Sequence, residues 1–234
     1  MQCYYGQLLS SILDVSEAVK RSYRSPARAA GVAATRSRVR EAAARLFTAQ
    51  GYVATTMRQV AREAGVGERT LYDGFATKAA LFGHTLGVAV AGDEEPVAVA
   101  QRPWLATLVA EPDPIAALRL LAASGSELLE RAGDLIMVSI EAAGADPDMR
   151  AAAHAGARAT YDVQLTVAAN LSERGALRDG MDPAVAADIL YTLLAPHTHQ
   201  LLRRHRQWSA GQYREWIHRA MVREVLAQRF QTAE

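Results

Sequence analysis

Apolar residues recur at helical spacing along most of the chain, and no long stretch alternates apolar with polar residues as a half-buried strand does. Over residues 38–50 they form one stripe, made of Val39, Ala42, Ala43, Leu46 and Phe47. Gly51 follows, where a left-handed helix cap is needed. Turn residues divide the rest of the chain. The pattern therefore predicts an all-α protein, with further helices over 57–64, 68–74, 77–92, 96–109, 114–131, 134–143, 147–174, 183–206 and 210–230.

Residues 55–75 predict two short helices joined by a tight glycine turn. Thr56 and Gln59 fit a capping box, in which the two side chains bind the unpaired amides at the start of a helix. Gly65 supplies the positive φ that the turn requires. The second helix carries polar groups in its first turn, and this is how a helix-turn-helix presents its recognition helix to the major groove of DNA.

Residues 36–82 resemble the N-terminal domain of TetR-family transcriptional regulators, over about a fifth of the chain. The motifs that carry the resemblance, specific as an ordered set, are Ala43-x-x-Leu46-Phe47, Gly51-Tyr52, Thr55-Thr56-Met57-x-x-Val60-Ala61, Ala64-Gly65-Val66, Thr70-Leu71-Tyr72, Phe75 and Thr77-Lys78-x-x-Leu81-Phe82. The resemblance implies a three-helix DNA-binding domain over 35–82 and a larger helical domain for ligand binding and dimerisation over 83–234. It also implies a homodimeric repressor that a small-molecule effector releases from a palindromic operator.

We expect the DNA contacts to come from side chains and amides at the helix starts, namely Thr55, Thr56, Arg58, Gly67, Glu68, Arg69, Thr70, Tyr72 and Lys78. Arg69 can bind guanine O6 and N7 together, or contact a phosphate, or lie solvated. Glu68 can accept from cytosine, stabilise the helix N-terminus or orient Arg69. Tyr72 can pack its ring inward and donate its hydroxyl to a phosphate, and the resemblance implies that this tyrosine contacts a phosphate. Gly74 departs from the family pattern, where a histidine or aromatic often stands, and this removes one expected backbone contact.

The remaining residues predict architecture more than chemistry. For an effector pocket the candidates are Trp104, Met137, His154 and Tyr161, with ordinary core packing as the alternative. Two apolar seams suit a homodimer interface, and the residues chosen from them are Leu190, Leu194, Leu201, Tyr213, Trp216, Ile217 and Met221. Packing within one chain is the alternative for both seams. We expect no metal site at His197 and His199, because residues two apart on a helix point in different directions.

Charge is divided unevenly along the chain. Residues 20–78 hold twelve arginines and lysines against four acids, a net charge of +8, whereas residues 79–234 carry −5. A basic segment joined to an acidic remainder is typical of a nucleic-acid reader with a separate second module. Residues 1–34 are expected to form an N-terminal extension, which is either flexible or marginally helical, or a basic arm along DNA, or an overextended gene start.

The single cysteine, Cys3, excludes an internal disulfide and fits a reducing cytoplasm. We see no signal peptide and no apolar run long enough for a membrane span, so we expect a soluble cytoplasmic protein with no cofactor. The absence of a phosphate loop, a metal-spaced His or Cys set and a nucleophile elbow argues against an enzyme. The alternatives are an activator or global regulator of the same build without an effector, and a protein-interaction module. The sequence does not identify the effector, the operator or the regulated genes.

Overall fold

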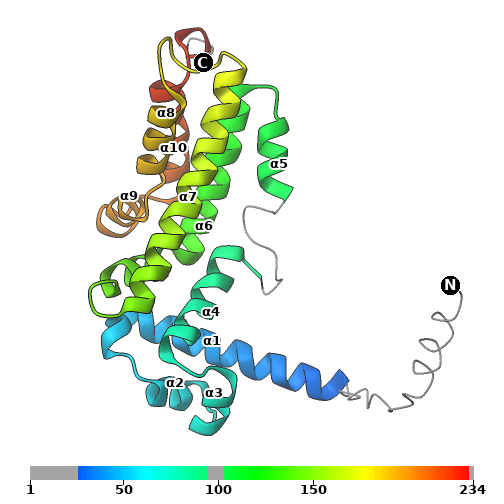
Figure 1. Ribbon diagram of the computed structural model, residues 1–234, viewed down its shortest axis with the longest axis vertical. Helices are drawn as coiled ribbons and strands as arrows, with labels where there is room; N and C mark the ends of the chain where they lie inside the picture. The colour runs from blue at the N-terminus through cyan, green and yellow to red at the C-terminus, as the bar shows by residue number, and fades with distance from the viewer. Residues whose placement is uncertain (1–25, 94–102, 232–234) are drawn as a thin grey trace, which may run out of the picture. The chain divides into compact units, whose positions relative to one another are not determined.

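The computed structural model describes residues 26–93 and 103–231 (Figure 1). The chain divides into two units, residues 1–35 and 36–234, and each is described by itself. Within the described ranges nearly every residue is helical, and the only β-type pairing is one isolated bridge between Leu177 and Leu226. The all-α prediction is therefore confirmed. In those same ranges, no helix combines the length and the apolar character needed to cross a membrane.

The elements follow one another in a simple order. They are α1 (Pro26–Ala54), α2 (Met57–Ala64), α3 (Glu68–Gly74), α4 (Lys78–Ala91), α5 (Pro103–Ala110), α6 (Pro114–Ala142), α7 (Pro147–Glu173), α8 (Pro183–Leu193), α9 (Pro196–His199), the π-helical η2 (Gln200–His205), α10 (Ala210–Val225) and the 3-10 turn η3 (Gln228–Phe230).

Helix ends fall where the capping chemistry predicts them. Thr56 and Gln59 form the predicted capping box, Thr77 accepts from the amide of Ala80, and Gly65 adopts the left-handed conformation with φ of 64°. Gly51 is also non-helical, with φ of 77°, and interrupts α1 near its end. At its other end α1 begins at Pro26, well before the predicted start at Arg38; the predicted extension over 1–34 otherwise lies outside the described residues.

Three Asp-Pro pairs start the helices of the C-terminal half. Asp113, Asp146 and Asp182 each accept hydrogen bonds from amides in the first turn of α6, α7 and α8. The proline that follows each aspartate has no N–H to leave unpaired, and its fixed φ suits the first helical position. These starts agree with the sequence prediction.

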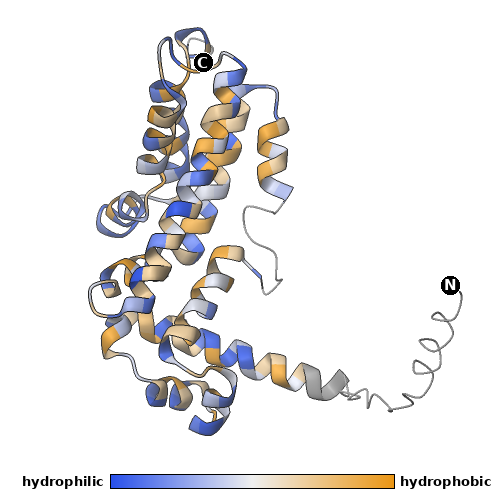
Figure 2. Ribbon diagram, viewed as in Figure 1, coloured by the Kyte–Doolittle hydropathy of each residue, from blue (hydrophilic) through white to orange (hydrophobic). Residues whose placement is uncertain are grey.

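Two hydrophobic clusters hold residues 36–231 together. One surrounds the buried rings of Phe47 and Phe82 and includes Leu135 and Val138 of α6 and Met149 of α7. The other lies among α5, α6, α7, α8 and α10. Figure 2 shows the corresponding division, with hydrophilic residues prominent on α2 and α3 and apolar ones along the packed sides of α6 and α7.

Two helix predictions were wrong. The predicted break near residues 132–133 does not occur, because α6 runs through Gly125 and Gly133 without interruption. Both glycines lie where another helix comes close: a Cβ on Gly125 would meet Leu194 at 2.7 Å, and one on Gly133 would meet the His199 ring at 3.3 Å. The predicted helix 183–206 instead ends at Leu193, since Pro196 starts a new turn.

Most of the predicted dimer contacts lie in the chain's own core. Leu190, Tyr213, Ile217 and Met221 are fully buried and Leu194 is nearly so. Packing within one chain, the alternative reading of these seams, therefore accounts for these five side chains, and their part in a dimer contact stays a prediction. Trp216 is half-buried against the same core. Leu201 is 57% exposed, so it can still contact a second chain.

We expect Gly125→Ala to destabilise the protein by about 1–2 kcal/mol, because the added methyl group meets the buried Leu194 side chain. Gly156→Ala is the matched control, since nothing lies within 4 Å of a Cβ built there on α7. It should stabilise the helix by about 0.5–1 kcal/mol. Urea unfolding of both variants measures the two changes in unfolding free energy. Equal changes would contradict the close approach of Leu194 to Gly125.

Candidate nucleic-acid interface and effector domain

The helix-turn-helix is held by a small core beneath its outer face. Val60, Ala61 and Leu71 are buried where α2 packs against α3, and Phe75 closes the cluster after α3 ends. Gly67 caps α3 with its backbone only, so the first turn begins without a side chain in the way. The side chains between the core positions are consequently left on the solvent side.

Several predicted DNA contacts share this exposed face. Thr56, Arg58, Gly67, Glu68, Arg69, Thr70 and Tyr72 are all exposed. Tyr72 is 49% exposed, so its ring is not packed inward as we expected from the residue. The hydroxyl of Thr56 is engaged in the capping box with Gln59. Contact of these residues with DNA remains a prediction.

Glu68 has a partner that the sequence did not indicate. The guanidinium of Arg58 lies 3.5 Å from its carboxylate, across the turn between α2 and α3. Both side chains are largely exposed, so the pair contributes little to stability. It does compensate the one acid in the first turn of α3, and Arg69 has no ion pair within residues 26–93 and 103–231.

Thr55 and Lys78 do not fit the predicted DNA contacts. Thr55 is fully buried, and its hydroxyl donates to the Gly51 carbonyl at 2.8 Å, so it closes the end of α1. The Lys78 ammonium donates to the carbonyls of Tyr52 at 2.8 Å, Thr55 at 3.0 Å and Val53 at 3.4 Å. These bonds account for the three protons of the ammonium, so a phosphate contact by Lys78, which stays a prediction, would have to replace one of them.

Tyr52 connects the helix-turn-helix to α7. Its ring lies 4.2 Å beneath the Lys78 ammonium, and its hydroxyl donates to Asp146 at 2.9 Å. Asp146 also caps α7, and bonds from the Met149 amide and from Tyr52 hold the pKa of its carboxyl below the usual range. Burial, followed by the bond to Asp146, raises the pKa of Tyr52. The Asp-Pro start of α7 was visible in the sequence, but a contact across 94 residues was not.

A basic and aromatic cluster lies on the other side of the helix-turn-helix core. The Arg36 guanidinium sits 5.4 Å from the centre of the Phe75 ring, and His84 packs against the same ring at 5.3 Å. Burial, then the charges of Arg36 and Arg40, lower the pKa of His84.

The four predicted effector contacts differ in exposure, and their part in ligand binding stays a prediction. Trp104 and Tyr161 are half-buried against the C-terminal core, where Tyr161 meets the ring of Tyr191. Met137 is buried within α6, and His154 is exposed on α7. The structure instead gathers polar side chains at a place that was not predicted, between α6 and the segment from α9 to α10.

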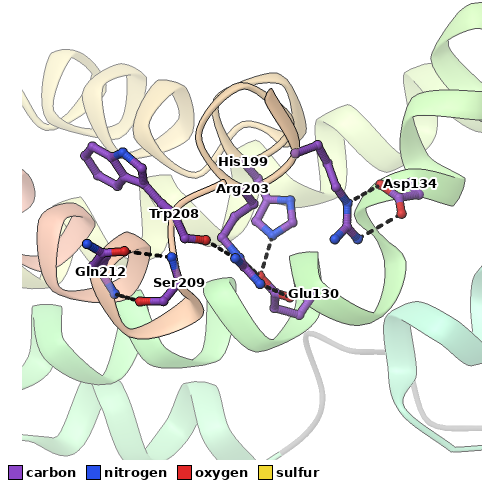
Figure 3. Close-up of polar contacts among 8 residues, drawn as sticks. Glu130, Asp134, His199, Arg203, Trp208, Ser209 and Gln212 are labelled. Carbon is purple, nitrogen blue, oxygen red and sulfur yellow. Dashed lines mark hydrogen bonds and ion pairs between the residues drawn. The ribbon is translucent and has the colours of Figure 1, made fainter. Parts of the chain in front are cut away.

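Glu130 of α6 is the centre of that polar cluster (Figure 3). Both nitrogens of the Arg203 fork bind its carboxylate, and Nε2 of the buried His199 lies 2.9 Å away. Arg204, the next residue, pairs with Asp134 one turn further along α6 at 2.9 Å. The hydrogen bond from Arg203, with a smaller contribution from His199, lowers the pKa of Glu130 to about 2. Burial, then the Glu130 charge, raises the pKa of Tyr213, whose ring packs edge-on against His199.

Lys78→Met should lower stability by about 1–3 kcal/mol, because the buried carbonyls of Tyr52 and Thr55 lose their donor. If Lys78 only closes α1, the salt dependence of DNA binding by the folded variant stays unchanged. If the slope of log affinity against log salt concentration instead falls by about one in the variant, Lys78 does contact a phosphate. Arg62→Gln, on the exposed side of α2, is the control for loss of one charge nearby.

Glu130→Gln should cost stability only where the wild-type carboxylate is ionised. Its pKa in the folded protein lies below the usual glutamate value of 4.5, so its contribution to stability is fully present above that pH and is lost as the pH falls toward about 2. The difference in unfolding free energy between wild type and variant should therefore shrink from pH 5 to pH 3 in urea titrations. Asp134→Asn, in the more exposed pair, should show a smaller difference. A pH-independent gap would contradict this assignment.

Comparison with known proteins agrees with this geometry. Residues 39–85 match the family model for the N-terminal domain of bacterial regulatory proteins of the tetR family. The resemblance predicted from the sequence is thereby confirmed. A search of curated proteins found no match.

Solved structures share the fold over most of both chains. NalD, the secondary repressor of the MexAB-OprM multidrug efflux pump in Pseudomonas aeruginosa, is 22% identical, with a TM-score of 0.63 over 84% of this chain and 98% of that one. The TetR-family transcriptional regulator PfmR from Thermus thermophilus is 21% identical, with a TM-score of 0.60 over 80% and 97%. SmeT in complex with triclosan is 17% identical, with a TM-score of 0.65 over 84% and 94%. The chain therefore has the fold of TetR-family regulators, with a helix-turn-helix domain followed by a larger helical region.

Proposed function

We propose that this chain, which carries the N-terminal domain of the tetR family, is a sequence-specific DNA-binding repressor. The observation that carries the proposal is the exposed first turn of α3, where Arg69 and Thr70 stand beside the compensated Arg58–Glu68 pair. Phosphate contacts come from Tyr72 and the amide of Gly67. Arg69 reads a base, because its guanidinium is exposed and can bind two acceptors of guanine.

The DNA-binding form is a homodimer on a palindromic site. Two copies would place their α3 helices about one turn of DNA apart, as helix-turn-helix dimers do. With most of the α10 seam buried in its own core, we assign the contact to α7 and α8, where Leu165 and Val185 are 37% and 51% exposed. Leu201 in η2 is also open for contact.

A small molecule bound by the C-terminal half releases the DNA. SmeT in its triclosan complex supports this by analogy. The route in this chain is the cluster shared by α1, α4, α6 and α7, because a shift of α6 or α7 must move residues that pack on the helix-turn-helix. An effector acts only through its different affinity for the two arrangements. An activator of the same build remains the second candidate.

Titration of the protein onto its own upstream DNA, followed by fluorescence anisotropy, tests this function. Affinity should fall steeply between about 50 and 200 mM salt, and the end point should give two chains per site. Arg69→Gln should weaken specific binding about tenfold to hundredfold and relax the preference at one base pair. Arg219→Gln, on the exposed side of α10, should leave both unchanged. Equal affinity for a scrambled duplex would contradict the proposal. If salt barely changes the affinity, a protein-interaction module is favoured instead.

A further inference from the structure

Tyr52 lies where three helices meet. It stands near the end of α1, directly after the break at Gly51, and is only 5% exposed. Its ring stacks on Phe47 of α1 and packs edge-on against Phe82 of α4. Its hydroxyl donates to Asp146, the cap of α7, at 2.9 Å. One side chain therefore contacts the end of α1, the first turns of α4 and the start of α7.

On one side, Tyr52 is tied to the start of the helix-turn-helix. The Lys78 ammonium binds the carbonyls of Tyr52 and Thr55, so the segment between α1 and α2 is held to the start of α4. Thr56 follows at once as the N-cap of α2, and α2 packs on α3 through their shared core. A displacement of Tyr52 therefore shifts the start of α2, and α3 moves with it.

On the other side, the carboxylate of Asp146 has two roles. Its Oδ1 accepts from the amides of Asp148 and Met149 at 2.9 and 3.2 Å and so caps α7. Its Oδ2 accepts from the Tyr52 hydroxyl. The backbone amide of Asp146 donates to the Ala142 carbonyl at the end of α6. Asp146 therefore moves with the turn between α6 and α7, and a shift of this turn lengthens the bond to Tyr52.

The bond between Tyr52 and Asp146 has the properties that a coupling contact needs. It joins a hydroxyl to a carboxylate across 94 residues of chain, and hydrogen bonds to a charged group are stronger than neutral ones. Such a bond is lost once its oxygens separate beyond about 3.5 Å, so a small shift of either end breaks it. The contact therefore has two discrete states, made and broken, and both ends influence which one is occupied.

We propose that the hydrogen bond between Tyr52 and Asp146 couples the helix-turn-helix to the turn between α6 and α7. While the bond is made, loss of order at one end loosens the other end. In its regulatory part, which rests on the proposed function, the bond transmits DNA binding at α3 to the start of α7. By reciprocity it also transmits a shift of α6 or α7 to α3. Tyr52 and Asp146 act here as positioning residues.

Amide hydrogen exchange of the free protein tests the coupling, because each end has amides that report on its own cap. Tyr52→Phe keeps the ring and removes the hydroxyl, and it should speed exchange at the Asp148 and Met149 amides about threefold to tenfold. Asp146→Ser keeps a capping side chain without the carboxylate, and it should speed exchange at the Gln59 amide of α2 by about the same factor. At Gln59 the double variant should exchange no faster than either single variant, since both remove the same bond.

Two matched variants separate coupling from a general loss of stability. Asp182→Ser changes the cap of α8 in the same way and should leave exchange at Gln59 unchanged. Thr85→Val removes a buried hydroxyl whose bond to the Leu81 carbonyl lies within α4, and it should leave exchange at Met149 unchanged. If either control acts as strongly as its counterpart, or if the two effects add in the double variant, the proposal is overturned.

Exchange with and without the chain's own upstream DNA tests the regulatory part. Saturating DNA should slow exchange at the Asp148 and Met149 amides about threefold in the wild type. It should leave these amides unchanged in Tyr52→Phe, although this variant still binds. If bound DNA leaves them unchanged in the wild type, transmission to α7 is overturned. Absence of DNA binding contradicts the proposed function instead, and exchange in the free protein still decides whether the two ends are coupled.

Discussion

The packing of Phe47, Tyr52 and Phe82 against one another is the constraint on which the rest of this molecule depends. Their ring centres lie 5.0–5.9 Å apart, in a cluster that α6 and α7 complete with Leu135 and Met149. Aromatic contacts of this kind combine a large buried area with a preferred geometry. Because α1, α4, α6 and α7 share this cluster, the orientation of α2 and α3 relative to the C-terminal helices is set by apolar packing.

Polar contacts add to the aromatic packing that sets the orientation of α2 and α3. Lys78, at the start of α4, donates to a carbonyl near the end of α1, and the Tyr52 hydroxyl donates to Asp146, the cap of α7. Neither contact reaches toward the exposed side of α3. The exposed residues predicted to contact DNA, among them Arg58, Arg69 and Tyr72, are therefore distinct from the residues that hold the angle between the helices.

Local chemistry was readable from the sequence because its partners are near in the chain. The capping box at Thr56, the left-handed Gly65 and the three Asp-Pro starts each depend on residues within four positions. The seam through Tyr213 was correctly identified as apolar, but periodicity does not say whether a seam faces its own chain or another. The bonds of Thr55 and Lys78 could not be predicted for a similar reason: both are polar residues near a helix start, and the sequence does not show that their bonds point inward to carbonyls. Glu130 gave no signal, since its partners lie about 70 residues away.

The π-helical turn η2 has a consequence for how this protein can change in evolution. A π turn holds one more residue than an α turn, and here it lets the neighbours Arg203 and Arg204 reach acids one turn apart on α6. Deleting a single residue between Gln200 and His205 would restore a regular helix and rotate both arginines away from Glu130 and Asp134. A change in the length of this short segment would therefore have to be matched by a change in the spacing of Glu130 and Asp134 on α6 if both ion pairs are to form.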